Sequence, residues 1–459
     1  MYKIDFAHPI SIYFVGIGGI SMSGLAEVLH HAGFRVSGSD WNESNITKQL
    51  VDKGISVKYG ESALHITDDI DVAVLTSAVH EDNKEFVEIK RRGIPYISRA
   101  ELLGQMMKNY DMPIAISGTH GKTTTTSMAS EILLAADTDP TLSIGGILKT
   151  IGGNIRIGKS EYFVTEACEY TNSFLSFFPR VSIILNVDAD HLDFFKDLDD
   201  IRSSFHKFAL LTPQNGALII NGDIPAYEEL CEGTSCKVIT FGFGEHNDYR
   251  ISDIAYDEQG NSTFRVSNKA YGSDEFNLIV PGEHNIQNAV ACIALADFLG
   301  LSREVTKTGL TNFSGTDRRF QYKGEVNGIT IIDDYAHHPT EISACLTAAK
   351  TFPNENVWCV FQPHTYSRTK ALLKEFAQAL SLADKVVLAD IYPARETDTL
   401  GISSENLLDE LKSLGCECYF FPTFEEIQKF LIKNCLNGDM LITMGAGDVL
   451  KIGENLLKK

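Results

Sequence analysis

The stretch Ile114-Ala115-Ile116-Ser117-Gly118-Thr119-His120-Gly121-Lys122-Thr123-Thr124 leads from an apolar run into a segment compatible with a helix from Ser127 to Ala135. A strand, a glycine-containing loop and a helix in this order are typical of a phosphate-binding loop. Lys122 would bring positive charge to the β- and γ-phosphates, and the hydroxyl of Thr123 would be placed for Mg²⁺. Ile116 replaces the first glycine of the strict pattern. We expect a nucleoside triphosphate, with a glycine-rich turn before an ordinary helix as the alternative.

Composition limits the class of protein. A chain of 459 residues with 44% hydrophobic residues is long enough for about three domains, each with a core. The net charge of -21 argues against nucleic acid or an anionic membrane as a general partner. The nine cysteines include no Cys-x-x-Cys pair, which favours reduced thiols over a zinc site. The N-terminus, Met1 to Pro9, has no apolar core of signal-peptide length, and no apolar run approaches the roughly 18 residues of a membrane span, so we expect a cytoplasmic protein.

The first expected domain, residues 1–108, alternates short β-rich runs with helical segments, which predicts a Rossmann-like parallel sheet. Its first turn is Gly16-Ile17-Gly18-Gly19, and Asp40 closes the next strand. This is a dinucleotide-type fingerprint with Ser21 at the third glycine position. NAD, a UDP-sugar and an empty turn all remain open. The expected strands are 12–15, 35–37, 72–75 and 95–97.

The central expected domain, residues 109–313, carries the phosphate loop on a P-loop ATPase-type sheet. Strands at 162–165 and 181–185 end at Glu166 and just before an acidic turn that contains His191. The carboxyl ends of parallel strands meet at one edge, so Glu166 and His191 are expected to flank the triphosphate. The alternative for the turn, with Asp188, Asp190 and Asp193, is a solvated charge cluster. Alternating runs between Ala217 and Val280 predict a small antiparallel addition.

The third expected domain, residues 314–459, again alternates strands with helices and predicts a second Rossmann-like sheet. Polar residues follow its expected strands at 330–332, 357–361, 385–389 and 440–443. A phosphate loop between two such sheets suggests an α/β enzyme that uses ATP to join two bound substrates. Joining a carboxylate to an amine needs activation, and phosphoryl transfer supplies it by forming an acyl phosphate.

At this point nearly the whole chain resembles the Mur ligases of peptidoglycan synthesis. The resemblance rests on these stretches: Phe14 to Gly19 with Met22-Ser23-Gly24, Gly118 to Thr124, Glu166-Ala167, Asp190-His191, Pro281 to Asn285 with Asn288, Arg318-Arg319-Phe320, Asp333 to Glu341, Phe361 to His364, and Met444 to Asp448. It implies an ATP-dependent ligase that joins L-alanine to UDP-N-acetylmuramate in the cytoplasm. ATP and Mg²⁺ are the implied cofactors, and small molecules, with neither nucleic acid nor membrane, are the implied partners.

The resemblance also implies roles for individual residues. Lys122, Glu166 and His191 would be catalytic, and Thr123, Glu166 and His191 would hold Mg²⁺. The implied ATP contacts are Gly118, Thr119, His120, Gly121, Lys122, Thr123, Thr124, His284, Asn285, Asn288 and Arg319. The implied UDP-sugar contacts are Gly16, Gly18, Gly19, Ser39, Asp40, Ser77 and Ala78, and the implied amino-acid contacts are Tyr335, His337 and Arg368.

Two positions depart from the family pattern. Cys168 stands where relatives have an aspartate, and Thr365 stands where many have a second arginine. Some sister ligases carry a carbamoylated lysine where this chain has His206-Lys207. We do not expect this modification here. Arg319 could instead form a surface ion pair, and His337 could be a core residue.

Three competing functions remain. A murein-tripeptide recycling ligase shares the fold and the loop, but the Asp333 to His338 and Phe361 to Arg368 stretches favour alanine addition. A nicotinamide-dependent oxidoreductase would leave the phosphate loop without a task. A nucleotide-gated interaction protein would bind ATP without turnover.

Overall fold

The structure is a computed structural model that describes residues 2–76, 78–192, 194–257, 260–270, 272–394, 396–398 and 400–458. The chain forms two compact units. The first comprises Met1–Val187, Arg202–Ile239 and Phe298–Leu301; the second comprises Asp188–Ile201, Thr240–Asp297 and Ser302–Lys459. The three domains expected from the sequence, 1–108, 109–313 and 314–459, stay a prediction.

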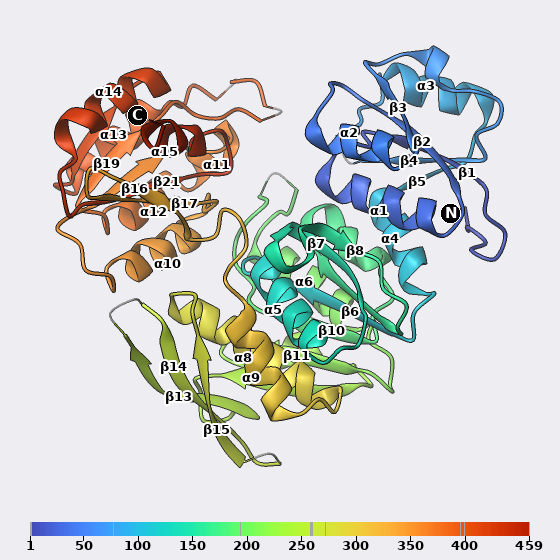
Figure 1. Ribbon diagram of the computed structural model, residues 1–459, viewed down its shortest axis with the longest axis horizontal. Coiled ribbons are helices and arrows are strands. Elements are labelled where there is room, and N and C mark those ends of the chain that lie inside the picture. Colours follow the sequence, from blue (N-terminus) through green and yellow to red (C-terminus); the bar gives the residue numbers. More distant parts are fainter. Residues whose placement is uncertain are drawn as a thin grey trace. The chain divides into compact units, whose positions relative to one another are not determined.

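The first unit begins with a parallel sheet of five strands in the order β3-β2-β1-β4-β5, drawn in blue in Figure 1. Tyr13 and Val15 of β1 pack with Phe86 and Ile89 of α3 on one face. The chain moves outward from β1 in both directions, so a crevice opens at the carboxyl ends of β1 and β4. The elements are β1 (Ser11–Val15), α1 (Ile20–His31), β2 (Arg35–Asp40), α2 (Asn45–Asp52), β3 (Ser56–Tyr59), η1 (Ala63–His65), β4 (Val72–Leu75), α3 (Lys84–Arg92), β5 (Tyr96–Ser98) and α4 (Arg99–Met107).

The first unit also holds the parallel part of the central sheet, in the order β11-β10-β6-β9-β7, with β8 antiparallel to β7. Its α5 begins at Lys122 and not at Ser127, because Gly121 has a φ of 84° and turns the chain into the helix at once. The elements, of which α6 and β12 extend into the second unit, are β6 (Met112–Ser117), α5 (Lys122–Ala135), β7 (Thr141–Leu148), η2 (Lys149–Ile151), β8 (Gly153–Arg156), β9 (Tyr162–Ala167), η3 (Tyr170–Ser176), β10 (Val181–Ile184), α6 (Leu198–Ala209), β11 (Ala217–Asn221), α7 (Tyr227–Cys231) and β12 (Lys237–Gly242).

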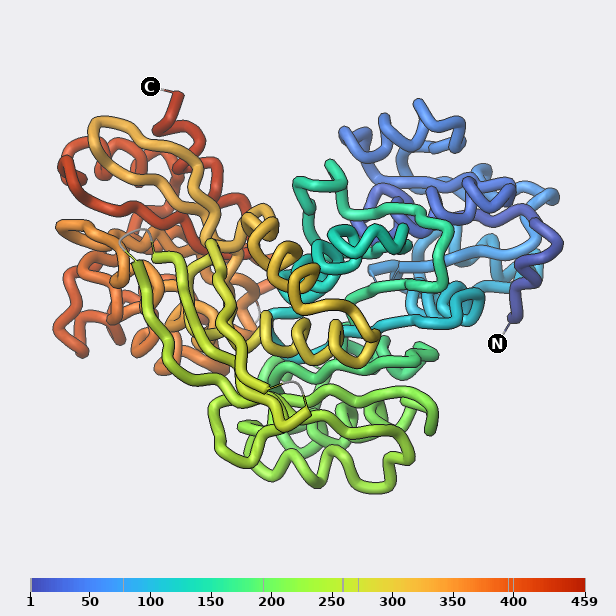
Figure 2. Tube along the Cα trace, turned by 60° about the horizontal axis from the view of Figure 1, so that its bottom comes forward, coloured from blue at the N-terminus to red at the C-terminus, as the bar shows by residue number. Residues whose placement is uncertain are grey.

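The second unit contains the small antiparallel addition, which confirms that expectation. Strands β13 (Tyr249–Tyr256), β14 (Ser262–Asn268) and β15 (Gly272–Leu278) run side by side in Figure 2 and pair antiparallel. They are followed by α8 (Glu283–Phe298) and α9 (Arg303–Asn312). Tyr249 donates a hydrogen bond to buried Asp297 at 2.8 Å, which ties β13 to α8.

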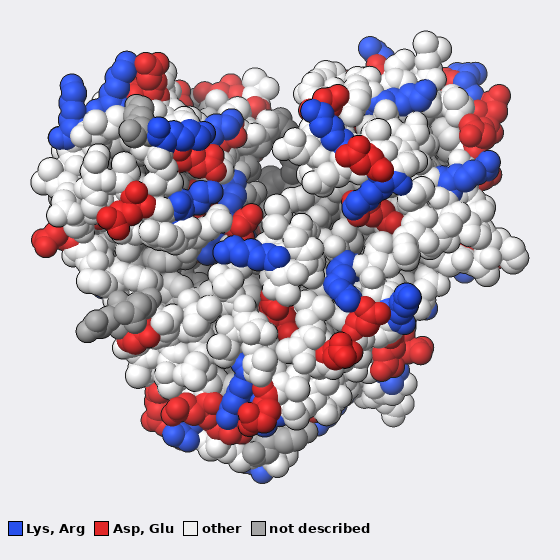
Figure 3. Space-filling model, in the orientation of Figure 1, with Lys and Arg blue, Asp and Glu red and all other residues white. Residues whose placement is uncertain are grey.

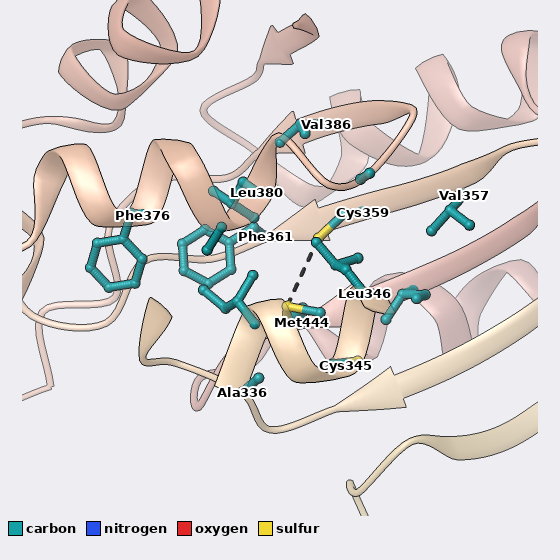
Figure 4. Close-up of a cluster of buried hydrophobic side chains, with 14 of the residues drawn as sticks. Ala336, Cys345, Leu346, Val357, Cys359, Phe361, Phe376, Leu380, Val386 and Met444 are labelled. Carbon is teal, nitrogen blue, oxygen red and sulfur yellow. Dashed lines mark hydrogen bonds between the residues drawn. The ribbon is translucent and has the colours of Figure 1, made fainter. Parts of the chain in front are cut away.

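The second unit ends with a six-stranded sheet in the order β16-β17-β21-β18-β19-β20, parallel except for β16. Successive residues of β18 point to opposite faces of the sheet, so Cys359 and Phe361 belong to one core cluster and Trp358 and Val360 to another. Phe361 packs with Phe376 and Leu380 of α12, and Cys359 Sγ lies 4.0 Å from Met444 Sδ (Figure 4). The elements are β16 (Gln321–Val326), β17 (Ile329–Asp334), α10 (Pro339–Ala349), β18 (Val357–Phe361), α11 (Tyr366–Ala371), α12 (Leu373–Leu380), β19 (Lys385–Leu388), α13 (Ser404–Ser413), β20 (Glu417–Phe420), α14 (Phe424–Asn434), β21 (Met440–Met444) and α15 (Leu450–Leu456).

The surface carries both signs of charge. On the face drawn in Figure 3, basic side chains lie among acidic ones and do not gather into one broad basic area. Among the described residues, none of the helices combines the length and the apolar character needed to cross a bilayer.

Candidate active site

The glycine turn after β1 is held by the end of β2. Gly16 and Ile17 donate their backbone N–H groups to the Ser39 carbonyl at 2.9 and 2.8 Å, and Gly18 donates to Asp40 Oδ2 at 2.8 Å. A Cβ on Gly18 would lie 2.7 Å from that Asp40 oxygen, so a larger residue there would displace the Asp40 carboxylate. Gly19 is the N-cap of α1, without a side-chain cap.

A cleft of about 380 Å³ lies at the carboxyl ends of β1, β2 and β4. It brings together four of the predicted UDP-sugar contacts, namely Gly16, Ser39, Asp40 and Ala78. Ser77 lies outside the described residues, and Gly18 and Gly19 are not part of the lining. The sequence analysis did not single out Trp41, His80 and Glu85, which also line the cleft. Trp41 follows Asp40 directly and is 69% exposed.

The phosphate loop holds its own lysine. Lys122 Nζ donates to the carbonyls of Gly118 and Thr119 at 2.5 and 3.0 Å, and it forms an ion pair with Glu169 at 2.9 Å. Burial alone would lower the pKa of Lys122, but Glu169, Cys168 and Glu166 together outweigh burial and the net pKa is raised. Lys122 is therefore a fixed positive charge. Glu169 was not predicted, because its role depends on a contact made across the fold.

Asn186 fixes the other side of the loop. Its side chain accepts the backbone N–H of His120 at 2.8 Å and donates to the His120 carbonyl at 3.0 Å. Glu166, at the end of β9, accepts the backbone N–H of Gly145 at 2.6 Å. Of the predicted metal ligands, Thr123 and Glu166 belong to the first unit and His191 belongs to the second.

The predicted adenine contacts lie together at the start of α8 in the second unit. His284, Asn285 and Asn288 fall on its first two turns. Asn285 donates to the Pro281 carbonyl at 2.7 Å, and Asn288 donates to Asn285 Oδ1 at 3.3 Å. Both asparagines are buried, so their side chains are held in fixed orientations.

The predicted amino-acid contacts also come together in the second unit. The rings of Tyr335 and His337 are 5.3 Å apart, and His364 lies 5.8 Å from His337. Arg368 Nη1 lies 3.2 Å from His364 Nδ1, and Arg368 donates through Nε and Nη2 to one oxygen of Asp190 at 3.2 and 3.0 Å. Asp190 was part of the acidic turn that we left open as a solvated cluster, and the structure pairs it with the predicted arginine.

Arg319 lies beside the same group. Its guanidinium is 5.5 Å from the centre of the Tyr335 ring and 3.8 Å from Glu341. Glu341 also accepts the backbone N–H of His337 at 3.1 Å. Arg319 thus has an ion-pair partner, which leaves both of the readings given above open.

Burial sets the charges in this group. It lowers the pKa of His337 to about 4, so the imidazole is neutral at pH 7. It raises the pKa of Asp334, whose side chain accepts the backbone N–H groups of Phe320 and Ala336, to about 6. Burial would also raise the pKa of Asp190, but the Arg368 guanidinium holds it below its ordinary value. Arg368 and Asp190 therefore form an ion pair within this group.

Three family models match the chain in sequence. Residues 11–111 match "Mur ligase family, catalytic domain", residues 116–296 match "Mur ligase middle domain", and residues 318–447 match "Mur ligase, glutamate ligase domain". A curated protein of Agathobacter rectalis, "UDP-N-acetylmuramate--L-alanine ligase", is 61% identical over the full length of both chains. The chain belongs to the Mur ligase family. A protein of the same name from Lachnospira eligens is 59% identical, again over the full length of both chains.

Solved structures of Mur ligases share this fold. The UDP-N-acetylmuramate-alanine ligase of Thermotoga maritima has a TM-score of 0.83 and 31% sequence identity, with 98% of each chain covered. The murein peptide ligase of Psychrobacter arcticus has a TM-score of 0.73 and 26% identity, also with 98% of each chain covered.

The two departures from the Mur ligase pattern have distinct surroundings. Burial raises the pKa of the Cys168 thiol, so it stays neutral, and the carboxylate that reaches Lys122 comes from the next residue, Glu169. Thr365 has a φ of 67° and donates its backbone N–H to the Tyr392 carbonyl at 2.9 Å. It leads directly into α11, the helix that carries Arg368.

Proposed function

We propose that this chain is an ATP-dependent ligase that joins L-alanine to UDP-N-acetylmuramate in the cytoplasmic synthesis of peptidoglycan precursors. The observation that carries the proposal is the 61% identity, over the full length of both chains, to a curated protein of that name. The local geometry supports it, because a phosphate loop with a buried, charged lysine serves ATP and leaves a separate cleft for the nucleotide of the second substrate.

Each substrate has a proposed place. UDP-N-acetylmuramate enters the cleft beside Ser39 and Asp40, within residues 1–108. ATP lies on the loop from Gly118 to Thr124, with α8 at its adenine, within residues 109–313. L-Alanine lies at Tyr335, His337 and Arg368, within residues 314–459. The support for this division is that Gly16, Ser39, Asp40 and Ala78 line one cleft, that the adenine contacts lie together on α8, and that Tyr335 and His337 lie side by side.

The reaction has two steps. The carboxylate of UDP-N-acetylmuramate attacks the γ-phosphorus of ATP, so an O–P bond forms and the bond to the leaving ADP breaks. The neutral amine of L-alanine then attacks the acyl carbon, so a C–N bond forms and phosphate leaves with the electron pair of the C–O bond, while the nitrogen loses a proton to water. Lys122 lowers the energy of the charge on the phosphoryl oxygens, because its own charge is fixed and preorganised.

In the proposed amino-acid site, His337 contacts the amine of L-alanine and Arg368 contacts its carboxylate. His337 Nδ1 lies 3.0 Å from the Tyr335 carbonyl, an acceptor, so Nδ1 carries the proton of the neutral ring. Its Nε2 then offers a lone pair that can accept a hydrogen bond from the amine of L-alanine. Arg368 uses one edge toward Asp190, and the remaining guanidinium N–H groups suit a substrate carboxylate.

The residues present also fit Mg²⁺, which prefers oxygen ligands. The Thr123 hydroxyl and the Glu166 carboxylate supply such oxygens beside the loop, and His191 is the proposed third contact. When bound, the ion neutralises charge on the phosphates. These ligands stay part of the proposal.

The test is phosphate release by the purified protein with ATP and Mg²⁺. Release should require both UDP-N-acetylmuramate and L-alanine, since one accepts the phosphoryl group and the other the acyl group. Equal release without the UDP-sugar would indicate a simple ATPase. A murein tripeptide that replaces L-alanine with higher kcat/KM would assign the chain to the recycling ligases. Glycine and L-serine in parallel reactions measure the amino-acid preference.

A further inference from the structure

Glu85 lies under the UDP-sugar cleft and has no part in the roles proposed so far. It is the second residue of α3, where Asn83 caps the helix by accepting its backbone N–H at 3.0 Å. Its side chain lines the cleft but is only 2% exposed. A carboxylate this deeply buried is costly unless hydrogen bonds satisfy it.

Three elements supply those hydrogen bonds. Tyr13 of β1 donates its hydroxyl at 3.2 Å, Ser39 of β2 donates its hydroxyl at 2.5 Å, and His65 of η1 places Nδ1 at 2.6 Å. A carboxylate can only accept, so each of the three partners donates a hydrogen bond to Glu85 and keeps its own proton. Burial raises the pKa of Tyr13, which keeps that hydroxyl protonated. All three hydrogen bonds of this network therefore run toward Glu85 as the acceptor.

These hydrogen bonds determine which groups of Ser39 remain for a ligand. A serine hydroxyl has one proton and two lone pairs, and this proton is committed to Glu85. The Ser39 carbonyl already accepts two backbone N–H groups from the glycine turn. What Ser39 offers to the cleft is therefore the lone pairs of Oγ, which pair only with a ligand donor.

The charges of the cleft point the same way. Asp40, Glu61 and Asp82 line it together with Glu85, and the described lining includes neither lysine nor arginine. Such a lining suits the N–H and O–H groups of uracil and ribose, whereas phosphate oxygens would meet like charge.

We propose that Glu85 is a positioning residue for the UDP-sugar: it accepts the hydrogen bond of the Ser39 hydroxyl and so orients the lone pairs of Ser39 Oγ toward an N–H or O–H donor of the uridine half. This inference rests on the proposed function, because that function names the ligand. It adds a residue that acts on the ligand through Ser39 and not by contact.

The test is a double-mutant cycle on binding. In Glu85→Gln the new amide can donate to Ser39, whose hydroxyl then turns its proton toward the cleft. The Kd for UDP-N-acetylmuramate, measured by calorimetry without ATP or L-alanine, should rise about ten-fold. Ser39→Ala should raise it by a similar factor. Adding Glu85→Gln to Ser39→Ala should change the Kd by less than about two-fold, because the two residues act as one unit.

Glu88→Gln is the matched control. Glu88 lies on the same helix, pairs with Arg91 and Arg92 at 2.6 Å, and is not among the residues that line the cleft. Its loss should leave the Kd at the wild-type value. A purely structural role of Glu85 would instead lower the fraction of binding-competent protein at an unchanged Kd, which the calorimetric stoichiometry reports.

Two results would overturn the proposal: a wild-type Kd in either single variant, or a full effect of Glu85→Gln in the Ser39→Ala background. If Glu85→Gln does not fold, wild type and Ser39→Ala decide. 3-Methyl-UDP lacks the uracil N–H, and 2′,3′-dideoxy-UDP lacks the ribose hydroxyls. The wild type should bind at least one of these analogues more weakly than UDP, and Ser39→Ala should abolish that difference. Equal binding of all three ligands by the wild type refutes the acceptor role of Ser39. A wild type that binds UDP-N-acetylmuramate but releases no phosphate with L-alanine contradicts the proposed function alone.

Discussion

The pair formed by Lys122 and Glu169 makes a prediction that separates stability from turnover. The Glu169 side chain is 2% exposed and the Lys122 side chain 15%, so the pair is largely buried. Lys122→Ala leaves the carboxylate without this partner in the interior. Breaking a buried pair from one side typically costs about 3 to 5 kcal/mol. The same change should lower turnover by about 10²-fold or more, because charge at the phosphates is lost.

The double variant Lys122→Ala/Glu169→Gln distinguishes the two effects. A neutral amide is far cheaper to bury than an unpaired carboxylate, so most of the lost stability should return, while turnover should stay low. Urea unfolding followed by circular dichroism measures the first quantity, and phosphate release at saturating substrates measures the second. Binding of UDP-N-acetylmuramate without ATP serves as the control for an intact cleft.

Two outcomes would refute this reasoning. If Lys122→Ala is as stable as the wild type, the pair contributes nothing to the free energy of unfolding. If the double variant regains turnover, Lys122 does not act on phosphate charge, and the loop is not the catalytic phosphate site.

The remaining predictions concern the amino-acid group. Arg368→Ala should raise the KM for L-alanine by at least about ten-fold and that for ATP far less, since Thr365 offers no second guanidinium; steady-state kinetics with a raised ATP KM alone would move Arg368 to the nucleotide site. His337→Asn should reduce the loss of stability on acidification. The native pKa of about 4 lies below the ordinary 6.5, so the unfolded state binds the extra proton between these values and stability falls as pH drops through that window, by up to about 3 kcal/mol. The free energy of unfolding depends on Asp334 in the opposite sense, because its raised pKa of about 6 makes stability fall as pH rises. Urea unfolding of His337→Asn and of the wild type at pH 7 and pH 4.5 therefore isolates the contribution of the histidine. An equal loss of stability in both proteins between these pH values would contradict the prediction.

Runs of apolar residues and glycine-containing turns were enough to predict several strands, the phosphate loop and the helix that follows it. The strand, loop and helix around Lys122 follow from an apolar run and two glycines, and β18 follows from the five consecutive apolar residues Val357 to Phe361. Strand β3 was missed because it lies at a sheet edge with mostly exposed residues, which leaves no apolar pattern to read. The start of α5 was placed too late because four threonines follow Lys122, and burial overrides their weak helix propensity.

The candidate site shows the same limit. Residues inside a motif could be named from the sequence, although their roles in binding and catalysis stay predictions. Glu169, Asn186 and Glu85 could not be named, because each acts through a partner 46 or more positions away along the chain. No spacing rule connects such pairs, and only the folded chain brings them into contact.

The two tryptophans of this chain differ in everything that determines their fluorescence. Trp41 lines the cleft at the carboxyl ends of β1, β2 and β4 in the first unit and is mostly exposed, whereas Trp358 is buried in the last sheet and donates its indole N–H to Asp439 at 2.9 Å. Water around Trp41 favours emission at longer wavelength, and the apolar core around Trp358 favours shorter wavelength. The protein thus carries one native optical reporter in each unit. Ligand binding near Trp41 and the unfolding of the sheet that holds Trp358 can each be followed by the wavelength of tryptophan emission, without an added dye.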